Sequence, residues 1–432
     1  MDGACTGIYV LVSSKRGRSS DPMVIWFDFS RFHTECPVAF SSYFFIDGMG
    51  LCSVIKLRSD LMLTRFEVEN YRGFKDRLVL DLTSVRNYTF NSQCVDGGVV
   101  SKALLVGRNG CGKTNLGLAL FDIVGTLTDK GLDIQMKDPS CFINGDGELP
   151  YATFVYCFRD DGGKGIRFEY RKANPETIVY ERLDLDGCLI YERNGNDSDY
   201  SGLALFNAKD LRMDLGDGKL SVLRYVANNT IQASGSPISF VMDFASKMLY
   251  FRSVQDENSY AGLVKGSEII DNFIMENGLV EDFQKFIHDM AKIDIKLERR
   301  MIEGMPDMLV QITRNRAFPF SKVASSGTKV LMLVYYWMRH FKDVKFLYMD
   351  EFDAYYHYEL AEDVLLNVRD IRGIQAIMTS HNTALMSNGI FRPDCYYLMD
   401  GGRIESFADR IPREIRFGHN LEKMYRNGEF DE

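Results

Sequence analysis

The chain has 432 residues, which is enough for one large domain or for two of modest size. Hydrophobic residues make up 46% of it and charged residues 26%, so its composition is that of a globular protein and excludes a disordered or fibrous one. The net charge is −9, so the chain has no overall positive field that would attract nucleic acid, although a local basic patch is not excluded. The sequence has no run of eighteen consecutive apolar residues, which excludes a transmembrane helix.

The first segment, residues 1–61, contains aromatic residues that follow no sustained helical or strand period. It carries six basic and six acidic residues, so the rest of the chain carries the whole net charge. One interpretation is a small accessory element. The other, which the missing periodicity favours, is a poorly ordered extension or a start codon placed too early.

The cellular compartment is indicated by two features of the sequence. The first residues lack a basic stretch followed by a sustained apolar one, so we expect no secretory signal. The nine cysteines are scattered without Cys-x-x-Cys pairs, which fits reduced thiols and argues against a structural zinc site. We therefore expect a cytoplasmic protein that does not enter a membrane.

From residue 62 onward the pattern becomes regular, and we expect one domain over residues 62–432. Strands are predicted at Leu63–Glu69 and Lys102–Val106, and the second runs into a glycine-rich loop and a helix over Asn115–Val124. Three strands with period-two alternation follow and indicate an antiparallel layer: Ala152–Phe158, Gly165–Arg171 and Thr177–Leu183.

Residues 202–300 have a mostly helical period, and we expect them to form a helical insertion in this domain. Beyond them strands and helices alternate and end in a hairpin. The predicted elements are a strand near Met308–Thr313, a helix over Thr328–Phe341, a strand at Phe346–Met349, a helix around Tyr358–Arg369, a strand at Ile374–Met378 and hairpin strands at Cys395–Met399 and Arg403–Phe407. This mixed order indicates an α/β fold.

A phosphate-binding loop follows the strand that ends at Val106. The sequence matches the pattern G-x-x-x-x-G-K-[ST] in full, with an apolar strand before it and a helix after it. Its residues are Gly107, Arg108, Asn109, Gly110, Cys111, Gly112, Lys113 and Thr114. The glycines let backbone N–H groups surround a phosphate, Lys113 would reach the β- and γ-phosphates, and Thr114 would offer its hydroxyl to Mg²⁺. The loop therefore predicts binding of ATP with Mg²⁺.

Two later strands end in polar residues that fit nucleotide hydrolysis. Asp350 and Glu351 follow an apolar strand, where Asp350 would hold Mg²⁺ and Glu351 would polarise the attacking water. Another apolar strand runs into His381. Either motif alone is a weak signal, because strands often end in solvated acids and a lone histidine is more often structural. Together they would bring Lys113, Glu351 and His381 to the ligand edge of an α/β sheet.

A serine–glycine cluster, Ser325, Ser326 and Gly327, precedes the predicted helix at Thr328. It has two interpretations. The cluster can be an ordinary helix N-cap, or it can be a second phosphate site, because free N–H groups and the helix dipole attract a γ-phosphate.

With these motifs in order, the chain resembles the ABC-type ATPases of the SMC, RecF and OLD group, catalogued broadly as AAA-type ATPase core proteins. The resemblance covers about residues 62–432. The segments that carry it are Asn70–Phe74, the loop at 107–114, Ser325–Gly327, Asp350–Glu351, Thr379–Asn382 and Arg392–Asp394. It implies a P-loop NTPase fold with an ABC-type head, in which a mixed sheet is joined by an antiparallel β layer and a helical insertion.

The resemblance also implies an assembly and further site residues. Two chains would sandwich two ATP molecules head to tail, so that the loop of one faces Ser325 and Gly327 of the other, as a homodimer or higher oligomer. His381 would contact the γ-phosphate, Asp353 would lie in the loop that communicates across the interface, and Arg72 would lie near the nucleotide. The sequence departs from the family in three respects. Gln135 is a poor candidate for a glutamine loop, and the Ser325–Gly327 signature lacks the second glycine of transporter ATPases. His357 stands where relatives have His-Pro, so we interpret it as structural.

The spacing of the motifs narrows the function. Between Thr114 and Ser325 there is no long coiled coil, and only 51 residues follow His381, which is too few for the nuclease domain of OLD-type proteins. We expect an ATP-hydrolysing, nucleotide-gated dimer in a prokaryotic defence or DNA-maintenance system, with a separately encoded nuclease or toxin as effector. Nucleic acid as a partner is left open. The alternatives are a slow or non-hydrolysing scaffold or sensor and, less favoured by the Asn70–Phe74 motif, the ATPase subunit of a transporter.

Overall fold

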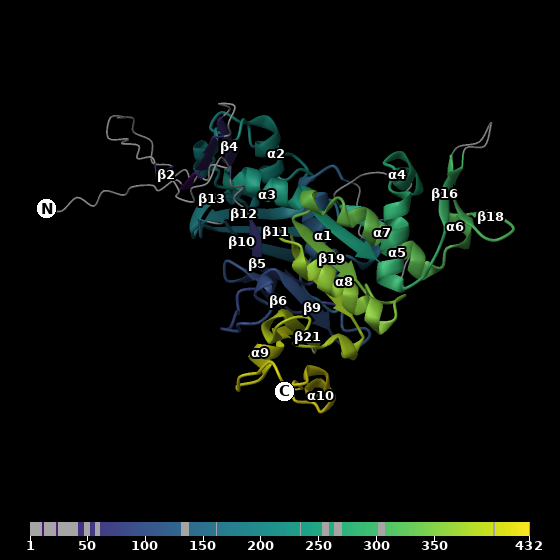
Figure 1. The fold of residues 1–432 in the computed structure, drawn as a ribbon. Helices are drawn as coiled ribbons and strands as arrows, with labels where there is room; N and C mark the ends of the chain where they lie inside the picture. Colours follow the sequence, from purple (N-terminus) through teal and green to yellow (C-terminus); the bar gives the residue numbers. More distant parts are fainter. Residues whose placement is uncertain are drawn as a thin grey trace. The chain divides into compact units, whose positions relative to one another are not determined.

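The structure is a computed structural model that describes residues 61–130, 138–160, 162–233, 235–252, 259–262, 270–300, 307–400 and 402–431 (Figure 1). In the first sixty residues it describes two antiparallel strand pairs, β1 (Leu11–Val12) with β2 (Met23–Val24) and β3 (Ser42–Ile46) with β4 (Cys52–Lys56). The chain divides into two compact units, Met1–Asp60 and Leu61–Glu432. Most of residues 1–61, for which we predict an extension or accessory element, lies outside the described residues.

A seven-stranded mixed sheet is the centre of the second unit. Its order is β15 (Ser259–Gly262), β14 (Met248–Arg252), β19 (Phe346–Asp350), β20 (Gln375–Ser380), β9 (Lys102–Val106), β21 (Tyr396–Asp400) and β22 (Arg403–Ser406). The five inner strands are parallel, and β15 and β22 are antiparallel edges. Every residue of β9, β19 and β20 is buried, which explains their apolar runs, because parallel strands are covered on both faces.

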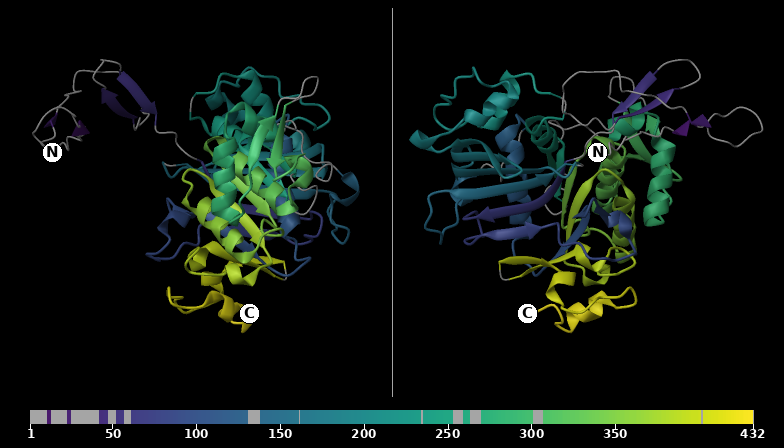
Figure 2. Two further views of the ribbon diagram at one scale, coloured as in Figure 1. Left: turned by 45° about the vertical axis from the view of Figure 1, so that its right-hand side comes forward. Right: turned by 90° about the vertical axis from the view of Figure 1, so that its left-hand side faces the viewer.

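A second, six-stranded sheet is wholly antiparallel. Its order is β13 (Cys188–Arg193), β12 (Thr177–Leu185), β11 (Gly165–Asn174), β10 (Ala152–Arg159), β5 (Met62–Glu69) and β6 (Leu78–Asp81). Figure 2 shows both sheets from two further directions. The α/β fold with a mixed sheet and an antiparallel layer, predicted from the sequence, is confirmed.

Helix α1 (Lys113–Leu127) packs between the two sheets. It contacts β14 and β19 of the central sheet. On its other side the Tyr156 hydroxyl of β10 donates a hydrogen bond to the Ala119 carbonyl at 3.0 Å. A buried ion pair also joins it to β11, where Lys172 Nζ lies 2.7 Å from Asp122 Oδ2. The helix that follows the phosphate-binding loop is therefore fixed to both sheets.

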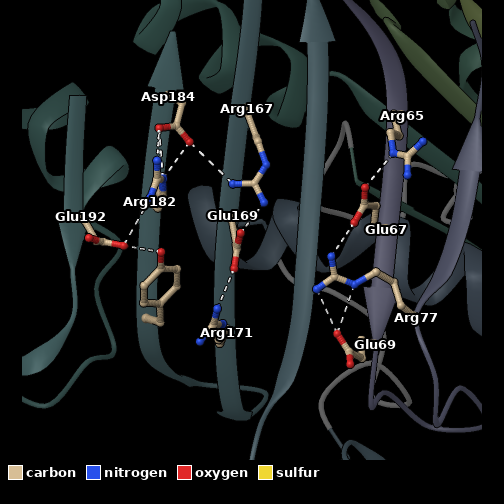
Figure 3. A network of polar contacts seen from close by, with 11 residues as sticks. Arg65, Glu67, Glu69, Arg77, Arg167, Glu169, Arg171, Arg182, Asp184 and Glu192 are labelled. Carbon is tan, nitrogen blue, oxygen red and sulfur yellow. Dashed lines mark hydrogen bonds and ion pairs between the residues drawn. The ribbon is translucent and has the colours of Figure 1, made fainter. Parts of the chain in front are cut away.

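The outer face of the antiparallel sheet carries a ladder of opposite charges (Figure 3). Directly opposite positions on neighbouring strands pair Arg65 with Asp81, Arg167 with Asp184, and Arg182 with both Glu169 and Glu192. Between neighbouring strands the N–O distances are 3.2 Å for Arg65–Asp81, 3.6 Å for Arg167–Asp184 and 3.6 Å for Arg182–Glu192. The carboxylates of Glu169 and Asp184 are buried beneath half-exposed arginines.

The remaining helices and strands lie around these sheets. Strands β7 (Val95–Asp96) and β8 (Val99–Val100) precede the phosphate-binding loop in the sequence. A three-stranded sheet, β16 (Leu297–Arg300), β17 (Met308–Ile312) and β18 (Ala317–Pro319), leads through α6 (Phe320–Val323) into α7 (Ser326–Met338). Helix α8 (Tyr358–Asp370) follows β19, and α9 (Phe407–Arg410) and α10 (Leu421–Arg426) come last. No helix in the described ranges is long and apolar enough to span a membrane.

The helical insertion predicted for residues 202–300 needs correction. The region does contain α2 (Val222–Asn229), α3 (Pro237–Ser246), α4 (Ile270–Glu276) and α5 (Val280–Ala291). However, β14, β15 and β16 also lie here, and β14 pairs in parallel with β19 inside the central sheet. A helical reading missed β14 because Met248–Phe251 is a short, continuous apolar run, which periodicity cannot assign.

Candidate functional site

The phosphate-binding loop joins the end of β9 to the start of α1. Gly110 and Gly112 have φ of +80° and +109°, which side-chain-bearing residues rarely adopt. A Cβ on Gly107 would lie 2.6 Å from the Met399 carbonyl oxygen, and one on Gly112 would lie 2.7 Å from the Phe74 ring. These glycines are thus required by the path of the backbone. Gly112 is the N-cap of α1 and has no side chain, so it leaves the first N–H groups of the helix without a side-chain cap.

Lys113 lies inside this loop and is 5% exposed. Its ammonium donates hydrogen bonds to the carbonyls of Gly107 at 2.9 Å and Arg108 at 3.4 Å. Burial lowers the pKa of Lys113, whereas the neighbouring Cys111, Glu351 and Asp350 raise it. The loop therefore holds the lysine with its charge directed at the place where glycines expose the backbone.

Asp350, at the end of β19, links the loop to the neighbouring strand β20. The Thr114 hydroxyl donates to Asp350 Oδ2 at 2.7 Å, and the Thr379 hydroxyl donates to Oδ1 at 2.8 Å. Asp350 is only 3% exposed. The hydroxyl and carboxylate oxygens are ligands that Mg²⁺ prefers, so this donor set fits the ion. Beyond this pair, the described part of the chain holds no cluster of three or more histidine, cysteine or acidic residues that could bind a metal.

Glu351 has the backbone strain that is common at functional sites. Its φ is +46°, and its N–H donates to the Thr379 hydroxyl at 2.8 Å. Its Oε1 lies 3.3 Å from His381 Nε2, and His381 Nδ1 lies 3.3 Å from Lys113 Nζ. The structure therefore brings Lys113, His381 and Glu351, predicted from three separate motifs, into one chain of polar contacts.

Asp353 lies one residue beyond Phe352 and faces the same edge. Its Oδ2 accepts a hydrogen bond from the Ser380 hydroxyl at 2.7 Å, and Ser380 Oγ accepts from the N–H of Asn382 at 2.8 Å. Burial raises the pKa of Asp353, while the Ser380 bond lowers it. The loop after β19 and the loop after β20 are thus tied together next to the Glu351–His381 contact.

Two tyrosines support the site, and we did not predict either. Tyr250 of β14 donates to Asp350 Oδ2 at 3.3 Å, and Tyr348 of β19 donates to the Lys113 carbonyl at 2.6 Å. Their rings are stacked, with centroids 5.6 Å apart. The position of Tyr348, two residues before Asp350 on a predicted strand, could have identified it. No sequence pattern indicated Tyr250 as a site residue, because the strand β14 that carries it was not predicted.

The segment Asn70–Phe74 forms a tight turn beside the loop. Tyr71 and Phe74 exchange backbone hydrogen bonds of 2.9 and 2.8 Å. A Cβ on Gly73 would lie 3.2 Å from the Asn115 side chain, so the turn contacts the start of α1. Arg72 has a φ of +49°, and its Nε donates to the Tyr71 hydroxyl at 3.1 Å. A role for Arg72 at the nucleotide stays a prediction.

The serine–glycine cluster begins α7. Ser325 is the N-cap and is exposed; its hydroxyl accepts from the Thr328 N–H at 3.2 Å and lies 2.8 Å from the Thr328 hydroxyl. Gly327 faces the loop after β19, since a Cβ there would lie 3.0 Å from the Tyr355 carbonyl oxygen. The described hydrogen bonds of Ser325 thus remain within its own helix. The N-cap interpretation holds, and a role for Ser325, Ser326 and Gly327 toward a phosphate of a second chain stays a prediction.

The last two residues considered in the sequence are Gln135, as a glutamine-loop candidate, and His357, as a structural residue. Gln135 lies outside the described residues. His357 is the N-cap of α8 and makes no side-chain capping bond; its carbonyl accepts the N–H of Ala361 at 3.0 Å. This backbone role agrees with a structural interpretation of His357.

Known proteins similar to this chain include one chromosome-partition protein and two solved structures. Over 245 residues the chain is 23% identical to the chromosome partition protein Smc of Halobacteriovorax marinus, a match covering 55% of this chain and 18% of Smc. The SMC head domain from Thermotoga maritima matches with a TM-score of 0.38 and 14% identity, covering 82% of this chain and 99% of that one. The recombination mediator protein RecF matches with a TM-score of 0.38 and 10% identity, covering 81% and 99%.

A family model covers the loop, both tyrosines, the serine–glycine cluster, the acidic pair and His381. It is described as "AAA domain, putative AbiEii toxin, Type IV TA system" and matches residues 102–387. This match confirms the recognition of an AAA-type ATPase core from the sequence motifs. The chain belongs to this family of AAA domains.

Proposed function

We propose that this protein binds ATP with Mg²⁺ and hydrolyses it. The observation that carries the proposal is the contact chain Lys113–His381–Glu351, which lies beside the Thr114–Asp350 pair at the carboxyl ends of parallel strands. A structural ion pair alone would not need a strained Glu351 backbone next to a lysine buried in a glycine loop.

In this proposal the chain's residues divide the chemistry. The loop N–H groups and the Lys113 ammonium bind the phosphates, and Thr114 and Asp350 would hold Mg²⁺. When bound, Mg²⁺ offsets the negative charge of the β- and γ-phosphates. Glu351 accepts the proton of the attacking water, and His381 fixes the Glu351 carboxylate and contacts the γ-phosphate.

We further propose that ATP joins two chains into a nucleotide-gated homodimer or larger assembly. The exposed N-terminus of α7, with Ser325 at its cap, supports a docking site for the γ-phosphate of a second chain. A slow or non-hydrolysing sensor is the alternative; the intact Glu351 favours hydrolysis.

We propose a cytoplasmic defence or DNA-maintenance system as the biological setting, with a separately encoded nuclease or toxin as effector. The family description names a putative toxin of a type IV toxin–antitoxin system, which supports a defence setting for this chain. The ATPase would then control the effector by its nucleotide state.

Two substitutions test hydrolysis at this site. Lys113→Ala removes the charge that binds the phosphates, so ATP binding should be lost. Glu351→Gln keeps the shape of the side chain but removes its basicity, so phosphate release should fall by roughly a hundredfold or more while ATP still binds. Binding is measured with a fluorescent ATP analogue and turnover by phosphate release.

The matched controls are Lys209→Ala and Glu359→Gln, which change exposed residues of the same types. Both should bind and hydrolyse ATP as the unsubstituted protein does. Tight ATP binding by Lys113→Ala, or unchanged turnover in Glu351→Gln, would show that this site is not the ATPase centre.

A further inference from the structure

A basic segment interrupts this acidic chain immediately before the serine–glycine cluster. Residues 292–329 contain eight lysines and arginines and four acidic residues, a net charge of +4. The rest of the chain therefore carries −13, given the total of −9. A charge reversal of this size over less than a tenth of the chain forms a local positive field that the overall charge conceals.

The segment contains the small sheet β16–β18 and helix α6, which we call the basic sheet. It projects at the right-hand edge of Figure 1, beyond α5 and α7. Its six cations are all exposed: Lys296, Arg299, Arg300, Arg314, Arg316 and Lys322. Lys296 pairs with Glu298 at 3.3 Å, and Arg299 pairs with Asp307. Among the described residues, the side chains of Arg300, Arg314, Arg316 and Lys322 have no acidic or hydrogen-bonding partner.

The turn between β17 and β18 presents two of these arginines on a fixed backbone. Thr313 closes the turn, because its N–H and its hydroxyl both donate to the Arg316 carbonyl at 2.8 Å. The Arg316 N–H returns a bond to the Thr313 hydroxyl at 3.2 Å. Arg314, Asn315 and Arg316 are all exposed at this turn. The turn is therefore ordered by its own backbone, and its cationic side chains are left for solvent or a ligand.

The charge ladder of the antiparallel sheet gives a contrast within the same molecule (Figure 3). There, Arg65, Arg167 and Arg182 each contact a carboxylate on a neighbouring strand, so that face is neutralised internally. In the basic sheet the unpaired arginines keep their charge without compensation. Of these two arginine-rich surfaces, only the basic sheet is suited to binding an external anion.

We propose that the basic sheet binds duplex DNA through its phosphates, with the Arg314–Arg316 turn as the main contact. Arginine forms forked hydrogen bonds with phosphate, and such contacts hold a protein on DNA without reading sequence. A β-ribbon is also narrow enough to enter the major groove of B-form DNA, whereas the major groove of duplex RNA is too narrow and deep for side chains to read.

Other occupants fit the observations less well. Single-stranded nucleic acid is held by successive aromatic rings, but the described tip carries arginines and an asparagine, and Phe318 of β18 is the single exposed ring among the described residues of the basic sheet. A protein partner would need an apolar centre with charges at its rim, whereas here charges occupy the exposed turn itself.

Binding to a fluorescein-labelled DNA duplex of about 30 base pairs, measured by anisotropy between about 50 and 200 mM salt, tests the proposal. We expect affinity that falls linearly with salt on logarithmic axes. Arg314→Gln/Arg316→Gln should weaken binding by roughly tenfold and reduce that slope by about 2, since each lost phosphate contact lowers it by about 0.9. ATP is not needed, so the result is separate from the test of hydrolysis.

The matched control is Lys209→Gln/Arg212→Gln, which removes the same charge from two exposed residues outside the basic sheet. It should bind DNA as the unsubstituted protein does, and both double variants should keep ATP turnover and thermal stability. The proposal is overturned if no binding occurs at low salt, if both double variants weaken binding equally, or if poly-glutamate or duplex RNA binds as tightly as the DNA.

Discussion

At the scale of single residues, Glu351 is positioned by its backbone as well as by its side chain. A positive φ outside glycine costs on the order of 1–3 kcal/mol and persists only where the surroundings enforce it. Here the Thr379 hydroxyl holds the Glu351 N–H, and the same hydroxyl donates to Asp350. One threonine thus holds both adjacent acidic residues, Asp350 through its carboxylate and Glu351 through its backbone N–H.

The buried Lys102 should make the free energy of unfolding depend on pH in the alkaline range. It is 2% exposed, its ammonium donates to the Ile374 carbonyl at 2.6 Å, and burial lowers its pKa from 10.5 to about 8. Between these values the unfolded chain binds more protons than the folded one, so the free energy of unfolding should rise with pH across this window. The rise should be on the order of 2 kcal/mol.

Urea unfolding at several pH values between 8 and 10 measures this effect. Lys102→Met keeps a long apolar stem but cannot titrate, so the difference between it and the unsubstituted protein isolates Lys102 from buried tyrosines and cysteines. Parallel pH profiles for the two proteins would mean that Lys102 does not titrate abnormally.

Sequence motifs located most residues that the structure brings to the sheet edge, because glycine loops and strand-end carboxylates have fixed spacings. Thr379 was noticed only as part of the motif that contains His381, and its bonds to Asp350 and Glu351 depend on strand pairing. Tyr250 could not be found, since its contact with Asp350 spans 100 residues of sequence. Contacts made between strands that are distant in the chain leave no local pattern.

At the scale of elements, α1 approaches the central sheet through Gly117. A Cβ at this position would lie 2.6 Å from the Tyr348 ring and 2.7 Å from the Tyr250 ring. These two rings in turn reach Lys113 and Asp350 through their hydroxyls. The distance between helix and sheet is thus coupled to the geometry of the nucleotide site.

Gly117→Ala should therefore impair both packing and turnover. Overpacking of this contact should lower the free energy of unfolding by about 1–3 kcal/mol, and displacement of the tyrosines should reduce ATP turnover. Gly125→Ala is the control on the same helix: Gly125 is exposed, so alanine should stabilise the helix by roughly 0.5–1 kcal/mol and leave turnover unchanged. Urea unfolding and phosphate release measure both effects, and equal behaviour of the two variants would contradict this coupling.

Most elements could be predicted because their burial patterns are simple. Strand β9 was predicted with its observed ends, and the antiparallel strands β10, β11 and β12 were found from alternation. Helix α7 begins two residues before its predicted start, because the Ser325 side chain caps it. The order of strands in each sheet could not be predicted, since it depends on which buried faces meet.

At the scale of the whole molecule, the proposed ATP sandwich makes a strong prediction about assembly. Glu351→Gln should bind ATP without hydrolysing it and therefore accumulate as an ATP-dependent dimer or larger assembly. Ser325→Arg places a bulky cation where the second chain's phosphate should dock, so it should block association while leaving ATP binding at Lys113 intact. Light scattering with and without ATP measures the mass.

Mixing variants tests whether each site is shared between two chains. A dimer of one Lys113→Ala chain and one Ser325→Arg chain contains one unsubstituted composite site and one doubly damaged site. An equal mixture should recover turnover up to roughly half of the normal value, because neither variant forms an ATP-driven dimer with itself and each mixed dimer has one of two sites intact. In a monomeric ATPase, Ser325→Arg would be fully active on its own, mixing would add nothing to its turnover, and Glu351→Gln would not associate with ATP.

The charge ladder on the antiparallel sheet also bears on how the chain avoids misfolding. A slip of β11 against β12 by two residues would keep every apolar side chain on the inner face, so hydrophobicity alone cannot prevent it. In the observed register Arg167 lies opposite Asp184 and Glu169 opposite Arg182. A slip in one direction would set Arg167 against Arg182, and in the other Glu169 against Asp184. Like-charge repulsion in the ladder thus destabilises the shifted registers and favours the observed strand pairing while the sheet assembles.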